Sequence, residues 1–131
     1  MSEENVEVVR RVYETLARSE PLGPDLLDPD VEYVNPPTAV EPGIRRGAAA
    51  FVEAVQAVYE GWSEWNMEPE EFTAIGDHVA VVVGYRARGS QSGVEMEGRE
   101  SALFTLRDGR VVRYAWFSEP GEALAAAESG A

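Results

Sequence analysis

The chain has 131 residues, 44% of them hydrophobic and 9% aromatic, which is enough to bury one core and predicts a single domain over residues 1–131. With 24 acidic residues against 11 Lys and Arg, a net charge of -13 and no basic cluster, the composition excludes nucleic acid as a partner. Cysteine is absent, histidine occurs once, and no signal peptide or apolar run of membrane length is present, so we expect a cytoplasmic protein without disulfides, metal sites or membrane contact.

The first part of the chain predicts a helix and then a strand. Apolar residues recur every three or four positions over residues 2–18, as in an amphipathic helix: Val6, Val9, Tyr13 and Leu16. The segment Pro21-Leu22-Gly23-Pro24 ends this helix, and residues 25–27 predict one more short helical turn. A strand follows over residues 31–35 and is ended by two prolines.

The middle of the chain predicts a loop and a second long helix. Residues 38–46 contain Pro42-Gly43 and predict a loop. A second helix is predicted from Gly47 to near Gly61. Its apolar residues form one stripe, as in an amphipathic helix: Phe51, Val55, Val58 and Trp62.

The last part of the chain predicts a meander of four antiparallel strands. The runs 65–75, 79–88, 94–107 and 110–118 have strand character and are separated by turn signals, of which Asp108-Gly109 is typical of a tight hairpin. A weak helix over residues 122–127 completes the chain. The order of elements predicts an α+β fold, with the helices on one face of a curved sheet.

This order, together with three segments, resembles the SnoaL-like branch of the nuclear transport factor 2-like superfamily; the segments are Val31-Glu32-Tyr33-Val34-Asn35-Pro36, Gly43-Ile44-Arg45-Arg46-Gly47 and Leu106-Arg107-Asp108-Gly109-Arg110-Val111-Val112. The resemblance covers nearly the whole chain. It implies a cone-shaped α+β barrel, in which a curved, mostly antiparallel sheet wraps around the N-terminal helices and encloses a deep apolar pocket. Members of the superfamily include polyketide cyclases, ketosteroid isomerase, scytalone dehydratase, limonene epoxide hydrolase and non-catalytic binding domains, so the fold alone does not choose a function.

Two known chemistries of the superfamily lack residues that they need. Ketosteroid isomerase requires a carboxylate base where Asn35 stands, and an amide cannot carry a proton near neutral pH, so we reject this chemistry. Limonene epoxide hydrolase has a Tyr-x-Asn pair that matches Tyr33 and Asn35. Its acidic and arginine positions, however, align with Val83, Tyr85 and Trp116, none of which can act as a general base.

An acid for a cyclase-type reaction has two candidates. SnoaL-type cyclases use an Asp on or after the last strand, where Glu119 is the nearest acid, but an acid before Pro120 is also an ordinary helix start. Glu100 is the favoured proton carrier, because the resemblance turns its strand face inward and burial raises the pKa of a carboxyl group. The alternative for Glu100, a solvated position or an ion pair with Arg45 or Arg99, stays open.

Tyr33 and Asn35 lie two residues apart on one strand, so their side chains share a face and can together hold a water or a ligand oxygen. With Glu100 they form the predicted catalytic set. The predicted ligand-binding residues are the aromatic and small apolar side chains that face the same space: Tyr13, Phe51, Val55, Tyr59, Tyr85, Ala102, Tyr114 and Trp116.

These residues predict a protein that binds a small, apolar, oxygen-bearing molecule and, if it is an enzyme, works as an isomerase, cyclase or hydrolase without a metal or organic cofactor. The alternatives are a non-catalytic ligand-binding domain and a dimerisation module whose cone is plugged by Trp62, Trp65 and Trp116. Apolar residues on the opposite strand faces predict a homodimer through the outer face of the sheet; these are Leu103, Ala115 and Phe117.

Overall fold

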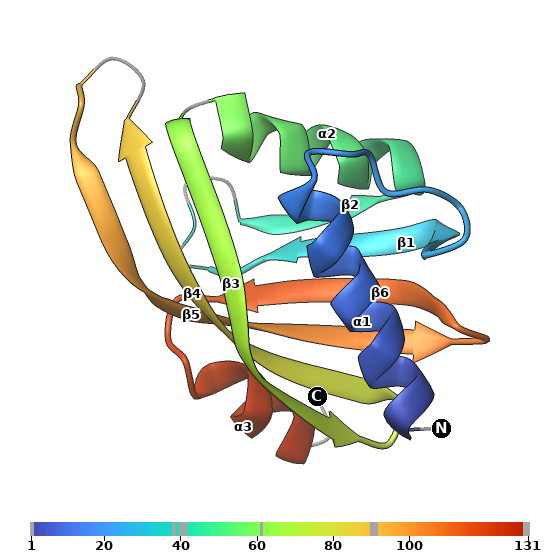
Figure 1. Ribbon diagram of the computed structural model, residues 1–131. Helices are drawn as coiled ribbons and strands as arrows, with labels where there is room; N and C mark the ends of the chain where they lie inside the picture. Colours follow the sequence, from blue (N-terminus) through green and yellow to red (C-terminus); the bar gives the residue numbers. More distant parts are fainter. Residues whose placement is uncertain (1, 38, 40–41, 61, 90–91, 130–131) are drawn as a thin grey trace.

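The computed structural model describes residues 2–37, 39, 42–60, 62–89 and 92–129. Two long helices, α1 (Ser2–Ala17) and α2 (Ala48–Glu60), lie on the inner face of one curved sheet, and a short helix, α3 (Glu122–Glu128), packs on its outer face (Figure 1). None of the helices in the described part of the chain is long and apolar enough to cross a membrane. The α+β class predicted from the sequence is confirmed.

The sheet has six strands in the order β2-β1-β6-β5-β4-β3. It is not closed into a barrel, and β2 and β3 form its two edges. The strands are β1 (Leu27–Asn35), β2 (Gly43–Arg46), β3 (Trp62–Ile75), β4 (His78–Gly89), β5 (Glu95–Arg107) and β6 (Arg110–Phe117). The pairing is antiparallel except between β1 and β6, which run parallel and join the two ends of the chain.

Two local predictions were wrong. Residues 43–46 form strand β2, not a loop, because Arg45 pairs with Tyr33 and Ile44 with Val34 along the edge of β1. The ion pair between Arg46 Nη2 and Glu32 Oε2, 2.7 Å long, holds this edge. Trp62, predicted as part of the apolar stripe of the second helix, begins strand β3 instead. The short turn predicted at residues 25–27 is present directly before β1, where the backbone N–H groups of Leu26 and Leu27 donate to the carbonyl oxygen of Gly23 (3.1 and 3.0 Å). Thr38, Val40 and Glu41 of the predicted loop, and Gly61 at the predicted end of the second helix, lie outside the described residues.

The Asp108-Gly109 hairpin predicted from the sequence is confirmed. Both residues have positive φ angles, 52° and 76°, which is the geometry of a type I′ turn and suits the twist of two antiparallel strands. This turn brings β5 and β6 together, so that Phe104 lies opposite Tyr114 and Ala102 opposite Trp116.

The core fills one end of the space between the helices and the sheet. The apolar stripe of α1 packs against aliphatic side chains from the central strands, and the most deeply buried of these residues are Val9, Leu27, Val31, Val79, Val81, Phe104 and Val111. At the edge of the core the guanidinium of Arg10 lies 4.6 Å from the centre of the Phe72 ring, which ties α1 to β3.

The outer face of the sheet is partly covered by the chain's own C-terminal helix. Ala123 and Ala127 of α3 pack against Ala80 and Leu103. The buried Ser101 Oγ donates a hydrogen bond to the carbonyl oxygen of Glu119 (2.6 Å) and accepts one from the backbone N–H of Ala123 (3.1 Å). Some of the apolar surface that the sequence assigned to a second copy is therefore buried within one chain, and the homodimer stays a prediction for the rest of this face.

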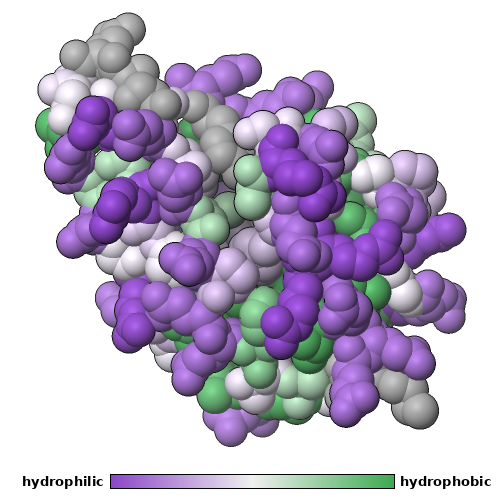
Figure 2. All heavy atoms as spheres, viewed as in Figure 1, coloured by the Kyte–Doolittle hydropathy of each residue, from purple (hydrophilic) through white to green (hydrophobic). Residues whose placement is uncertain are grey.

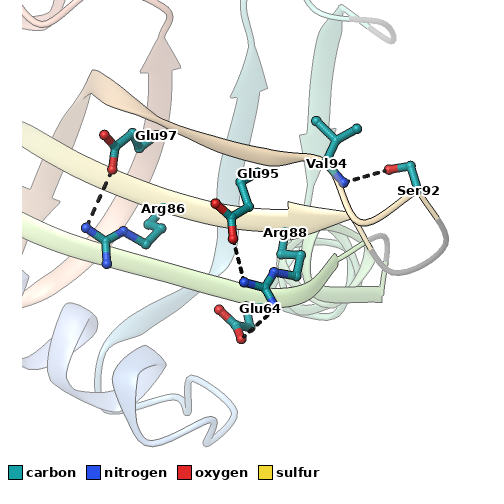
Figure 3. A network of polar contacts seen from close by, with 7 residues as sticks. All are labelled: Glu64, Arg86, Arg88, Ser92, Val94, Glu95 and Glu97. Atoms are coloured by element: carbon teal, nitrogen blue, oxygen red, sulfur yellow. Dashed lines mark hydrogen bonds and ion pairs between the residues drawn. The ribbon is translucent and has the colours of Figure 1, made fainter.

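The β4–β5 hairpin carries a row of ion pairs on its outer side, at the end away from α3. Arg86 pairs with Glu97, and Arg88 pairs with both Glu95 and Glu64 (Figure 3). Hydrophilic residues also cover most of the face seen in Figure 2, with smaller hydrophobic areas between them, in keeping with the high content of acidic residues.

Candidate functional site

A cavity of about 750 Å³ lies between the inner face of the sheet and the two long helices, next to the packed core. Its wall combines side chains of α1 and α2 with side chains from all six strands. Cavities that bind small organic molecules commonly have volumes of roughly 300 to 1,000 Å³, so this one is large enough for such a ligand.

Most of the side chains predicted to form a site line this cavity. They are Tyr13, Tyr33, Asn35, Phe51, Val55, Tyr85, Glu100, Tyr114 and Trp116. Ala102 is buried in the core cluster and does not belong to the described lining, although it shares the inner face of β5. Tyr59 belongs to α2, and its side chain lies outside the described residues.

One wall of the cavity is a group of aromatic rings on β1, β5, β6, α1 and α2. The ring of Tyr33 lies 5.1 Å from the rings of both Phe51 and Tyr114, and Phe104 lies 5.1 Å from Tyr114 on its other side. Tyr13 of α1 extends the group with an edge contact to Phe104. Because edge-to-face contacts fix the angle between rings, these side chains hold one another in place.

A second aromatic group forms on the β3–β4 side. The rings of Trp65 and Tyr85 stack 5.8 Å apart with 14° between their planes, and Trp62 packs against Trp65. Gly98 on β5 leaves room for this stack, because a Cβ atom there would meet Tyr85 Oη at 2.9 Å. From the sequence, Trp65 was considered as a plug of the cone and not as a ligand-binding residue; its alternation with Glu64 and Asn66 on β3 was the signal for an inward side chain.

Glu100 is the only carboxylate among the described residues that line the cavity. Burial raises the pKa of this carboxyl group to about 7. Its neighbour Arg99 does not pair with it, since Arg99 Nη2 lies 2.8 Å from Glu70 Oε1 on the other face of the sheet. The group therefore exchanges its proton near neutral pH, as a general acid or base requires.

Two phenols lie within the electrostatic reach of Glu100. Burial and, to a smaller extent, the Glu100 charge raise the pKa of Tyr33 to about 12, while Arg45 opposes this shift. Burial and Glu100 likewise raise the pKa of Tyr13. Both tyrosines thus stay protonated near neutral pH, and each keeps a hydroxyl group that can donate a hydrogen bond in the cavity.

Asn35 is bound to a residue from the other end of the chain. Trp116 Nε1 donates a hydrogen bond to Asn35 Oδ1 at 2.7 Å, across the parallel pair of β1 and β6. The three tryptophans line the cavity and do not fill it, which differs from the plugged cone considered as an alternative. Trp65 Nε1 is the buried side-chain nitrogen or oxygen that lacks a hydrogen-bond partner within the described structure.

Other residues considered from the sequence lie elsewhere. Glu119 is exposed and does not line the cavity. Its backbone N–H donates a hydrogen bond to Glu122 Oε1 (3.0 Å) at the start of α3. His78 begins β4 and lies 3.0 Å from Thr105 Oγ1 through its Nδ1 atom. Within the described residues no three His, Cys, Asp or Glu side chains come close enough to hold a metal ion.

The fold agrees with a comparison to known families, in which the model of the SnoaL-like domain matches residues 9–114. This chain belongs to the SnoaL-like family. No curated protein matches it. The match includes β1 and most of the sheet, and so it covers Tyr33, Asn35 and Glu100, while Trp116 lies just beyond it.

Solved structures share the fold of this SnoaL-like protein over nearly their whole length. A nuclear transport factor 2-like protein from Burkholderia pseudomallei is 22% identical with a TM-score of 0.79, covering 95% of this chain and 97% of its own. A candidate SnoaL-like polyketide cyclase from Jannaschia sp. CCS1 is 20% identical with a TM-score of 0.79, covering 100% and 95%. TerC, co-crystallised with polyporic acid, is 23% identical with a TM-score of 0.77, covering 95% and 98%. At these identities the similarity shows the fold alone.

Proposed function

We propose that this SnoaL-like protein binds a small, largely apolar molecule that carries an oxygen group, and acts on it as an isomerase, cyclase or hydrolase with Glu100 as the proton carrier. The observation that supports this most is a lone carboxylate in the described wall of an aromatic cavity. Tyr33 and Asn35, on β1 of the same sheet, orient the oxygen of the ligand. The reaction needs no metal or organic cofactor, because proton transfer by a carboxyl group is enough to interconvert a ketone and its enol.

The burial of Glu100 supports a role in proton transfer. A carboxyl group with a pKa near 7 is present in both protonation states at neutral pH, so it can take up a proton and return it. The apolar lining favours the same chemistry, since few waters compete with the ligand for the polar groups. TerC with polyporic acid gives an example of a protein of this fold crystallised with an organic acid.

The proposal can be tested with acetylnaphthalene, an apolar aromatic methyl ketone, dissolved in D2O near neutral pH. The Glu100 carboxylate takes a proton from the methyl carbon, the electron pair of that C–H bond forms the C=C bond of the enolate, and the π pair of the carbonyl group moves to its oxygen. The proton on Glu100 exchanges with D2O, and a deuteron then returns to carbon as the carbonyl group re-forms. Mass spectrometry follows deuterium uptake. We expect the wild-type protein to accelerate exchange by about 100-fold or more over buffer, the range of general-base catalysis.

Glu100→Gln is the matched variant, since the amide keeps the shape of the side chain but cannot accept the proton. It should bind acetylnaphthalene and leave exchange at the rate in buffer. Equal exchange by wild type and Glu100→Gln would remove Glu100 from the mechanism. Binding without any exchange in the wild type would favour a non-catalytic ligand-binding protein, the second candidate.

A further inference from the structure

The hydrogen bond between Trp116 and Asn35 carries information about the ligand. An indole Nε1–H is a donor and never an acceptor. Of the two heavy atoms at the end of the Asn35 side chain, only the oxygen can therefore face Trp116, and the 2.7 Å contact with Oδ1 has this arrangement. The usual ambiguity between oxygen and nitrogen in an asparagine side chain is thus resolved by its partner.

The Nδ2 group of Asn35 is available to a ligand in the cavity. Asn35 lines the cavity, and among the described residues its side chain makes no hydrogen bond besides the one to Trp116. The Nδ2 group has two N–H donors and no acceptor capacity. If the amide turned over, an N–H of Asn35 would point at the N–H of Trp116, and the hydrogen bond would be lost. Trp116 on β6 therefore keeps the Asn35 amide in one orientation, with Oδ1 toward the indole N–H.

We propose that Trp116 is a positioning residue that holds Asn35 as a fixed hydrogen-bond donor, so that the cavity selects ligands by an acceptor oxygen, such as a ketone or ester carbonyl. This inference rests on the proposed binding function and narrows its ligand class. A ligand group that can only donate, such as an ammonium group, would gain no hydrogen bond from the N–H donors of Asn35. The other polar groups near Glu100 are less selective, because a phenol such as Tyr33 both donates and accepts.

Two probes of equal shape test the inference. Acetylnaphthalene carries a carbonyl oxygen where isopropenylnaphthalene carries a CH2 group, so their affinities differ through that oxygen. Titration calorimetry gives the ratio of the two dissociation constants in each variant. We expect the wild type to prefer the ketone by about tenfold, the value of one good hydrogen bond.

Trp116→Phe keeps an aromatic ring but removes the N–H that holds the amide, and Asn35→Leu removes the amide itself. Both variants should lose most of the preference for the ketone while still binding isopropenylnaphthalene. In the double variant the loss should be no larger than in Asn35→Leu alone, because Trp116 acts through Asn35. Additive losses would show that Trp116 contacts the ligand directly and would overturn the positioning role.

A measurement on the wild-type protein does not depend on the folding of any variant. In a 15N-labelled sample, the side-chain amide protons of Asn35 should shift downfield on binding acetylnaphthalene and stay in place on binding isopropenylnaphthalene. Equal affinity for the two probes, with no shift of these protons, would overturn the inference while leaving the proposed binding function intact. Failure of both probes to bind would overturn the two together.

Discussion

The two ends of the inner face of the sheet are built from the same strands but are filled in different ways. At one end Val79 and Val81 of β4 meet Leu27 and Val111, each at most 1% exposed, in a close-packed core. At the other end the same β4 carries Tyr85, and β5 carries Glu100, around a cavity of about 750 Å³. A step of a few residues along one strand thus separates solid packing from open space.

The chemical nature of the side chains accounts for this difference. Branched aliphatic side chains interdigitate across facing elements until few voids remain. Large flat rings pack against each other instead, as Trp65 does on Tyr85 and Tyr33 on Phe51, and rings held in this way form walls. The packed end therefore supplies stability to the cavity end, where a polar group is buried at a cost.

The sharpest way to test this contrast is a pair of matched Leu→Ala variants. Leu27 is 1% exposed and lies in the packed end, so Leu27→Ala should leave a closed void and lower the free energy of unfolding by about 2 to 5 kcal/mol. Leu22 lines the cavity, so Leu22→Ala only enlarges an existing space and should cost about 2 kcal/mol, the transfer term alone. Urea denaturation measures both, and equal losses would contradict the distinction between the two ends.

The next largest effect is the pH dependence of stability caused by Glu100. Its pKa rises from 4.5 to about 7 on folding, so between these values the folded protein binds more protons than the unfolded chain. The free energy of unfolding should therefore fall as pH rises from about 4.5 to about 7, by up to about 3 kcal/mol, and show no further loss from this group above that range.

Glu100→Gln should lack this fall, so the stability of the variant minus that of wild type should grow across the same interval. Urea unfolding at a series of pH values measures the difference. Glu97→Gln, which removes a charge from the exposed hairpin, controls for the general effect of net charge on stability. A constant difference between wild type and Glu100→Gln would mean that the carboxyl group is solvated in the folded protein.

The smallest predicted effect concerns the second aromatic group of the cavity. Trp65 Nε1 is buried without a hydrogen-bond partner within the described structure, and Trp65→Phe removes this donor while keeping a ring to stack on Tyr85. We expect the free protein to gain about 1 kcal/mol of stability in chemical denaturation. Trp62→Phe, at the neighbouring ring, is the control and should bring no gain. A lower free energy of unfolding for Trp65→Phe would show that the packing of the indole ring stabilises the protein by more than its unpaired N–H destabilises it.

Features determined by residues close together in the chain were predicted better than features determined by contacts between distant residues. The Asp108-Gly109 turn depends on residues adjacent in the chain, and it was predicted correctly. Strand β2 was missed because Gly43–Arg46 has no strand pattern of its own and becomes a strand through pairing with β1. The cover that α3 gives the outer face was missed for a similar reason, since it depends on contacts with Ala80 and Leu103.

For the candidate site, the sequence by itself determined which side chains share a strand face, because alternation along a strand is a local property. It therefore put Tyr33 and Asn35 on one face of their strand, while the inward direction of Glu100 came from the resemblance to the SnoaL-like family. Only the tertiary structure decided that this interior is hollow at one end, that burial shifts the pKa of Glu100, and that Trp116 holds an asparagine 81 residues away. These properties arise from the volume and polarity of groups that meet across the sheet, and no local pattern encodes them.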